Sequence, residues 1–149
     1  METASQNLIK YSNYQEQFKR LNKALKSQFY LEAIFIEYAI LEDRTKSILR
    51  HSNCSCKGKN EGSLFDRVEK IREISIHGSL PARYFDEALL DSILVWKNER
   101  NDLIHALMKR SLTTEELQML AADGYKLARI LANKSTNYTR ALERRSKNK

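Results

Sequence analysis

The sequence predicts an all-α protein, an up-and-down bundle of four to five helices. Apolar residues recur at steps of three and four over long stretches, and the alternation typical of β-strands is absent. Gly and Pro, which interrupt helices, number only four and one in 149 residues. Because no repeat or linker divides the chain, and because this length suits one hydrophobic core, we expect a single domain.

The composition indicates a globular protein rather than a disordered or membrane-spanning one. Hydrophobic residues make up 42% of the chain and charged residues 30%. No apolar run approaches the roughly 20 residues that span a bilayer. The residues after Met1 are polar, so the sequence shows no signal peptide. We therefore expect a cytoplasmic protein with no membrane partner.

The positive charge is concentrated at the C-terminal end. The net charge is +7, and residues 134–149 contribute +5 of it through six Lys or Arg against one Glu. We expect a helical domain over residues 1–133 and a basic tail over 134–149, either a helix extension or disordered. Such a tail suits nucleic-acid phosphates, whereas the alternative is a solvated, fraying helix end. The candidate nucleic-acid contacts are Arg140, Arg144, Arg145 and Lys147.

Apolar spacing predicts the first two helices at about residues 5–27 and 29–51. Tyr14, Phe18, Leu21 and Leu25 mark one face of the first helix. The apolar stripe of the second helix consists of Leu31, Ile34, Tyr38, Leu41, Thr45 and Ile48.

Two carboxylates of the second helix, Glu37 and Glu42, flank its apolar stripe on opposite sides. A carboxylate beside a core stripe often pairs with a buried arginine. Our hypothesis is that Glu37 or Glu42 orients Arg100 or His105 of a later helix. The alternative is that both carboxylates lie at the core boundary and pair with surface lysines.

A loop is expected over residues 52–62. His51, Cys54 and Cys56 are close together there, but a zinc site needs a fourth ligand and the sequence has no further cysteine. We therefore expect free thiols and no metal. Lys57 and Lys59 are further candidates for RNA contact.

Helix-start signals predict the remaining helices. Ser63 and Asp66 resemble a capping box that opens a third helix, and His77-Gly78 ends it. Pro81 suits the first turn of a fourth helix, over residues 81–109. Thr113 and Glu116 form a capping box for a fifth, which runs to about residue 133 or beyond. Within it, Gly124 suggests close approach to another helix.

The fourth helix carries the most informative residues. Its apolar stripe has a cation, Arg100, where the next apolar side chain should stand. A buried guanidinium is expensive unless it is paired or faces a wet cleft. Asn101 follows directly, and His105 lies five positions after Arg100. That spacing corresponds to about 140° of rotation and about 7.5 Å of rise, so only Asn101 and His105 share a face.

The segment from Arg100 to His105 resembles the R-x(4–6)-H signature of HEPN domains, small helical units many of which are metal-independent ribonucleases. Members typically have Asn, Asp or His after the arginine, and Asn101 fits. The segment from Tyr38 to Arg44 looks like the family's second helix, and the resemblance spans roughly residues 5–133. It implies a HEPN-like bundle, no cofactor, and a homodimer in which two motifs meet in one cleft.

The chemistry of RNA supplies a mechanism for these residues. The RNA 2′-hydroxyl is a built-in nucleophile, so no metal is required. His105, with an ordinary pKa near ~6.5, can act as general base or acid. Arg100 can hold the phosphate and stabilise charge in the transition state. Asn101 would bind the phosphate or fix the histidine ring. The products would be a 2′,3′-cyclic phosphate and a 5′-hydroxyl.

The sequence therefore predicts a metal-independent RNA endonuclease of the toxin, antiphage or RNA-processing type. Its expected partners are RNA, a second copy of the chain, and an antitoxin or the product of a neighbouring gene. The alternative is a non-catalytic helical module that binds nucleic acid or a partner protein, such as a nucleotidyltransferase antitoxin. In that case Arg100 pairs with a carboxylate and His105 lies at a helix end. A third possibility is a dimerisation scaffold.

Overall fold

The computed structural model describes residues 3–54 and 62–148, and within them every regular element is a helix. The elements in chain order are α1 (Ala4–Lys26), α2 (Tyr30–His51), α3 (Leu64–Ile74), the 3-10 helix η1 (Pro81–Arg83), α4 (Glu87–Ala106) and α5 (Thr114–Lys147). The prediction of an all-α bundle is confirmed.

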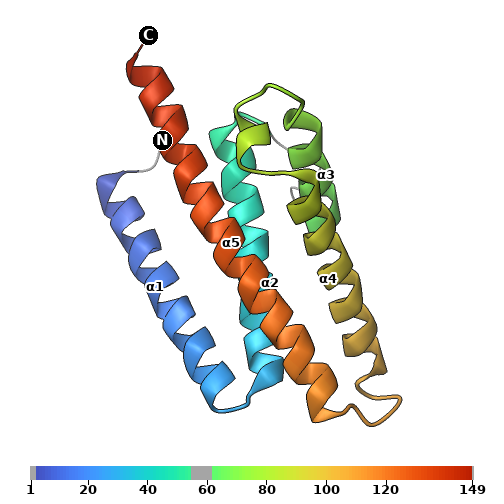
Figure 1. Cartoon of the computed structure of the whole chain (residues 1–149). Helices are drawn as coiled ribbons and strands as arrows, with labels where there is room; N and C mark the ends of the chain where they lie inside the picture. The colour runs from blue at the N-terminus through green and yellow to red at the C-terminus, as the bar shows by residue number, and fades with distance from the viewer. Residues whose placement is uncertain (1–2, 55–61, 149) are drawn as a thin grey trace.

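Helices α1, α2, α4 and α5 alternate in direction along the bundle (Figure 1). The main packing pair is α2 and α5, and α2 also packs against α1 and α3. Helix α4 packs against α3 and α5. Consequently α2 is the central helix, with α5 crossing its front in Figure 1 and α1 and α4 to either side.

The core consists of the apolar stripes of these helices. Helix α2 contributes most to it because apolar residues occur on several of its sides. At its start the prediction was wrong for Leu31, which is 41% exposed although it belongs to the expected stripe. The largest fully buried side chains are Trp96, Tyr138, Phe85, Leu21, Ile34, Leu41, Ile48, Leu64, Ile71, Leu90, Ile93 and Leu131.

Both capping boxes expected from the sequence are present. The Ser63 hydroxyl accepts a hydrogen bond from the Asp66 backbone N–H, and the Asp66 carboxylate accepts one from the Ser63 N–H. Thr113 and Glu116 do the same at the start of α5. Each box satisfies two backbone donors that a helix start leaves without partners.

The predicted bounds of the third and fourth helices were wrong. Helix α3 ends at Ile74 instead of continuing to residue 77. Pro81 begins η1 rather than α4. Helix α4 starts at Glu87, after Asp86 accepts a hydrogen bond from the Leu89 N–H at 2.8 Å, and ends at Ala106 rather than at residue 109. The aspartate side chain thereby satisfies one of the backbone N–H groups that a helix start leaves free.

Helix α5 passes residue 133 without interruption and reaches Lys147. Ser135, Tyr138 and Ala141 are buried in this extension. The Tyr138 hydroxyl lies 2.6 Å from Ser52 Oγ of α2's C-terminal cap, and its ring packs edge-on against Phe85, with 5.2 Å between centroids. Residues 134–147 are thus a helix extension that packs on the bundle.

Among residues 3–54 and 62–148, no helix is both long and apolar enough to cross a membrane.

Candidate functional site

Arg100 is held by an aromatic ring and an amide. Its guanidinium carbon lies 4.0 Å from the ring centroid of Tyr38 on α2. Its Nη1 donates a hydrogen bond to Oδ1 of Asn101 at 3.2 Å. The residue is half-buried, and its Nε is buried without a hydrogen-bond partner among the described residues. The packing orients the guanidinium, and its Nε–H donor remains without a partner among the described residues.

The predicted ion pair between Arg100 and Glu37 or Glu42 is absent from the described residues, where no carboxylate lies within 4.0 Å of this guanidinium. Glu42 instead pairs with Arg67 of α3, with 3.6 Å between Oε1 and Nη2. The alternative of a surface lysine partner was also wrong for Glu42. Without a neutralising carboxylate, the Arg100 charge is available to an external anion.

Arg67 is a second cation on an apolar stripe, and the sequence analysis missed it. It is 2% exposed. Its Nε donates to Thr45 Oγ1 at 3.2 Å, and its Nη1 donates to the Gly62 carbonyl at 2.6 Å. The sequence pattern that indicates such a cation was present, because Arg67 stands between Leu64 and Ile71 at helical spacing. Unlike Arg100, Arg67 is satisfied inside its own chain.

The charges of Arg100, Arg67 and Glu42 all act on Tyr38. Burial raises the pKa of its hydroxyl, Glu42 adds to the rise, and Arg100 and Arg67 oppose it. The phenol therefore stays protonated at neutral pH. Tyr38 serves here as a flat platform for Arg100, a role that the sequence analysis did not assign to it.

Glu37 lies elsewhere, in contact with α5. Its carboxylate is fully buried beside Gly124, and neither oxygen has a hydrogen-bond partner among the described residues. Burial, with a smaller contribution from Asp123, raises the pKa of this carboxyl to about 9. Glu37 is consequently neutral at pH 7, and both predicted roles for it were wrong. The carboxyl lies beside Gly124 and forms no ion pair with Arg100.

His105 is exposed on the last turn of α4. It forms no hydrogen bond or ion pair with any residue in the described part of the chain. Asn101 precedes it by four residues and shares its face, but Arg100 points about 140° away around the helix. One protomer therefore brings Arg100 and Asn101 together and leaves His105 apart from Arg100.

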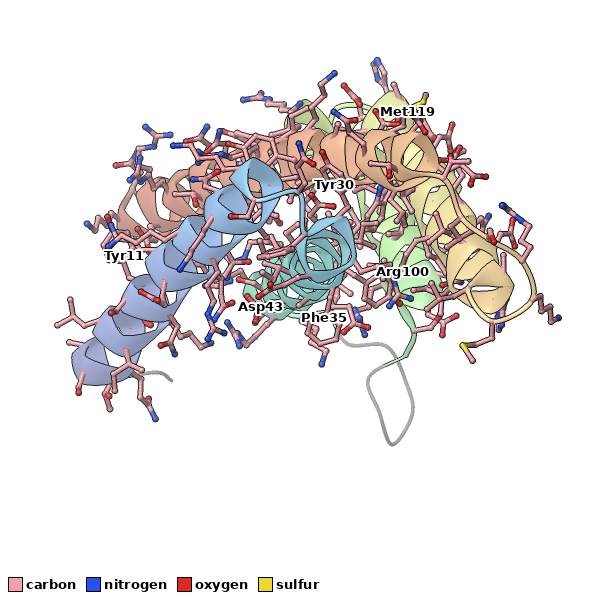
Figure 2. All side chains as sticks on the ribbon, turned by 90° about the horizontal axis from the view of Figure 1, so that it is seen from below. Tyr11, Tyr30, Phe35, Asp43, Arg100 and Met119 are labelled. Atoms are coloured by element: carbon pink, nitrogen blue, oxygen red, sulfur yellow. The ribbon has the colours of Figure 1, made fainter. Side chains whose placement is uncertain are left out.

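Exposed apolar side chains surround this end of the bundle. Ile104 of α4 is 40% exposed and follows Arg100 by one turn, and Leu107, the C-terminal cap of α4, is 39% exposed. Phe35, one turn before Tyr38 on α2, is 70% exposed. Figure 2 shows Phe35 and Arg100 on the side of the bundle away from α5. Ile104 and Phe35 thus place exposed apolar surface near Arg100.

The basic end of α5 is far from Arg100. Arg140, Arg144, Arg145 and Lys147 are exposed there. Helix α5 starts near the C-terminal end of α4, and Arg144 is thirty residues further on, which is about 45 Å along the axis. The C-terminal ends of α4 and α5 lie toward opposite ends of the bundle (Figure 1). Within one chain, Arg100 and these basic residues cannot contact the same phosphate.

Cys54 is a free thiol whose Sγ lies 3.5 Å from the Ser52 carbonyl. Cys56, Lys57 and Lys59 lie outside the described residues. Within the described ranges, no three His, Cys, Asp or Glu side chains are grouped so as to hold a metal ion.

The chain matches no protein-family model, and no curated protein or solved structure shows significant similarity to it.

Proposed function

We propose that this protein is a metal-independent RNA endonuclease of the toxin, antiphage or RNA-processing type, built on a HEPN-like bundle and acting in the cytoplasm. The observation that carries the proposal is the state of Arg100. Its guanidinium is half-buried on Tyr38, and no carboxylate of the described residues pairs with it. A cation in that position costs free energy unless an anion joins it, and an RNA phosphate fits its planar fork.

The reaction needs only a proton carrier and a charge stabiliser. The RNA 2′-oxygen attacks the adjacent phosphorus, and the bond from phosphorus to the 5′-oxygen breaks. A histidine imidazole takes the 2′-hydroxyl proton, and a second imidazolium gives a proton to the leaving 5′-oxygen. Arg100 stabilises the charge that builds on the phosphate oxygens. Asn101 holds Arg100 through Oδ1 and keeps its amide N–H for the phosphate or for His105.

The proposal includes a homodimer, because one protomer does not complete this site. Arg100 and His105 point in different directions around α4. A two-fold axis beside α4 would add the arginine and the histidine of the second copy. The exposed Phe35, Ile104 and Leu107 supply apolar area for such an interface.

The second candidate is a non-catalytic module that binds nucleic acid or a partner protein, such as a nucleotidyltransferase. The separation of His105 from Arg100 within one chain favours it. Such a module needs no proton transfer, so it does not require Arg100 and His105 to lie together.

The test is degradation of a labelled single-stranded RNA in the presence of EDTA. We expect the wild-type chain to cleave it, and Arg100→Ala and His105→Ala to lose at least about 100-fold in rate while keeping native circular dichroism. His77→Ala, an exposed histidine before η1, is the matched control and should cleave normally. Absence of cleavage together with RNA affinity retained in both variants would establish the binding module instead.

A further inference from the structure

A groove of about 590 Å³ runs between α1 and α5, with α2 as its floor. Helices α1 and α5 both pack on α2, and they form the two walls of the groove. Three aromatic side chains of α1 line it: Tyr11, Tyr14 and Phe18. Four cations line it as well: Lys10, Lys19, Arg44 and Arg129. None of the lining residues is acidic.

The cations and rings of this α1/α5 groove are paired. The Arg44 guanidinium lies 4.1 Å from the ring centroid of Tyr14. The Arg129 guanidinium lies 4.9 Å from that of Phe18, and its Nε donates to the Tyr125 hydroxyl at 3.1 Å. Each pair fixes a positive charge beside a flat apolar ring.

Two cations of the α1/α5 groove, Lys19 and Arg129, pair with no carboxylate among the described residues. Arg44 pairs with Asp43 at 2.8 Å, but that carboxylate is more than half exposed and lines a neighbouring pocket on the other side of Tyr14. By contrast, the groove between α4 and α5 has Asp91, Glu99 and Asp123 among its lining residues. The basic character therefore belongs to one face and not to the whole surface.

The basic face continues along α5 beyond the groove. At about 100° per residue, Arg140 and Lys147 fall within about 20° of Arg129 around the helix. Arg144 falls about 60° away, at the same angle as Lys126 of the α4/α5 groove, and Arg145 falls about 160° away. Two of the four cations expected to contact nucleic acid thus extend the groove as one track, and the other two do not.

We propose that the α1/α5 groove and this track bind single-stranded nucleic acid. Unpaired bases stack on the aromatic side chains of α1, and the phosphates follow Lys19, Arg129 and the basic face of α5. Stacking on rings requires bases that are free of a duplex, and the row of cations matches a polyanion. The site lies across α2 from Arg100, as the positions of Tyr11 and Arg100 in Figure 2 show, and it does not depend on cleavage there.

The test is fluorescence anisotropy with labelled 15-nucleotide probes. One probe is 2′-O-methyl RNA, which has no free 2′-hydroxyl and cannot be cut by the proposed mechanism. The others are single-stranded DNA and the corresponding duplex. We expect both single strands to bind more tightly than the duplex, with affinity that falls as salt rises. Binding of the duplex with equal affinity would overturn the proposal.

Point variants locate the site. Tyr11→Ala and Arg129→Ala replace exposed side chains and should weaken single-strand binding at least about fivefold. Arg129→Ala should also reduce the slope of log affinity against log salt by about 0.7. The controls are Lys126→Ala in the acidic groove and Arg145→Ala on α5, which remove the same charge and should change affinity less than twofold. Equal losses in the controls would show general electrostatic attraction and reject the groove.

Polyglutamate is the competitor that separates a nucleic-acid site from one for acidic protein. It supplies negative charge without bases, so it should displace the single-stranded probe only at much higher concentration. Displacement at the same residue concentration as poly(U) would assign the groove to an acidic partner and overturn the proposal. None of the labelled probes can be cleaved by the proposed mechanism, so their affinities are measured independently of catalysis. Loss of catalysis and loss of binding are therefore distinguishable.

Discussion

Arg100 of α4 and Tyr38 of α2 form a stacked pair, with 4.0 Å between the guanidinium carbon and the ring centroid. The pair fixes the direction of the guanidinium without neutralising it. Arg67, the comparable cation of α3, is neutralised by Glu42. The difference between these two arginines separates a candidate functional cation from a structural one.

Tyr38→Phe should keep RNA cleavage near the wild-type rate, and Tyr38→Ala should lower it by about two- to thirtyfold. The ring, not the hydroxyl, contacts Arg100, and a cation–π contact of this kind contributes about 0.5–2 kcal/mol. Initial rates on a labelled RNA, measured beside thermal melts, check this. Equal loss in Phe and Ala variants would show that the hydroxyl and not the stacking matters.

Glu37→Gln should stabilise the protein increasingly as pH rises. The pKa of this carboxyl is about 9 in the folded chain, against an ordinary value of 4.5. Between those values the unfolded chain releases a proton that the folded chain keeps, so unfolding is favoured more at each higher pH. At pH 7 the Glu37 carboxyl destabilises the folded chain by roughly 3 kcal/mol. This follows because pH 7 lies about 2.5 units above the ordinary pKa, and each unit corresponds to about 1.4 kcal/mol.

Urea unfolding at pH 5 and pH 8 measures this effect. The gain of Glu37→Gln over wild type should be larger at pH 8, and Glu32→Gln, an exposed carboxylate on the same helix, should show no such trend. A gain that is independent of pH would mean that Glu37 is already ionised in the folded protein.

Gly124→Ala should destabilise the protein by about 1–3 kcal/mol. A Cβ at this position would overlap the Glu37 carboxyl and lie 2.5 Å from Cζ2 of Trp96. Alanine gains about 1 kcal/mol in helix propensity, but overpacking of this size outweighs that gain. Thermal melts measure the result, with exposed Ala122→Gly as the reference for propensity alone. A more stable Gly124→Ala variant would show that Trp96 has room to move.

Tyr138→Ala should cost about 3–5 kcal/mol of unfolding free energy, and Tyr138→Phe only about 1. The ring is 2% exposed and packs against Phe85, whereas the phenylalanine variant loses only the hydrogen bond with Ser52. Urea titration measures both. A near-neutral alanine variant would show that residues 134–147 do not contribute to the core.

Much of the fold was predictable because the apolar spacing of α1, α2 and α5 is regular. The expected helix at residues 5–27 differs from α1 by one residue at each end, and the one at 29–51 differs from α2 by one residue at its start. The fourth helix was predicted to start six residues early. Pro81 and Asp86 are both acceptable start signals, and local sequence does not decide between them. The loop between α3 and α4 sets the start of α4, because this loop must place Phe85 in the core.

The site was predictable only in part. A cation on an apolar stripe identified Arg100, yet the same rule also fits Arg67, and only the position of Glu42 separates the two. The burial of Glu37 depends on how closely α5 approaches at Gly124, which spacing along α2 does not reveal. The α1/α5 groove results from the angle between two helices distant in sequence. Such angles depend on side-chain packing across the whole bundle.

The central claim is that Arg100 stabilises the transition state of RNA cleavage by the adjacent 2′-hydroxyl. Its most direct test is end-group analysis of RNA incubated with the wild-type protein and with Arg100→Ala, in EDTA. The account predicts 2′,3′-cyclic phosphate and 5′-hydroxyl ends from the wild type, none from the variant, and none from a 2′-O-methyl substrate. Intact RNA with the wild-type protein, or 5′-phosphate ends, would contradict it.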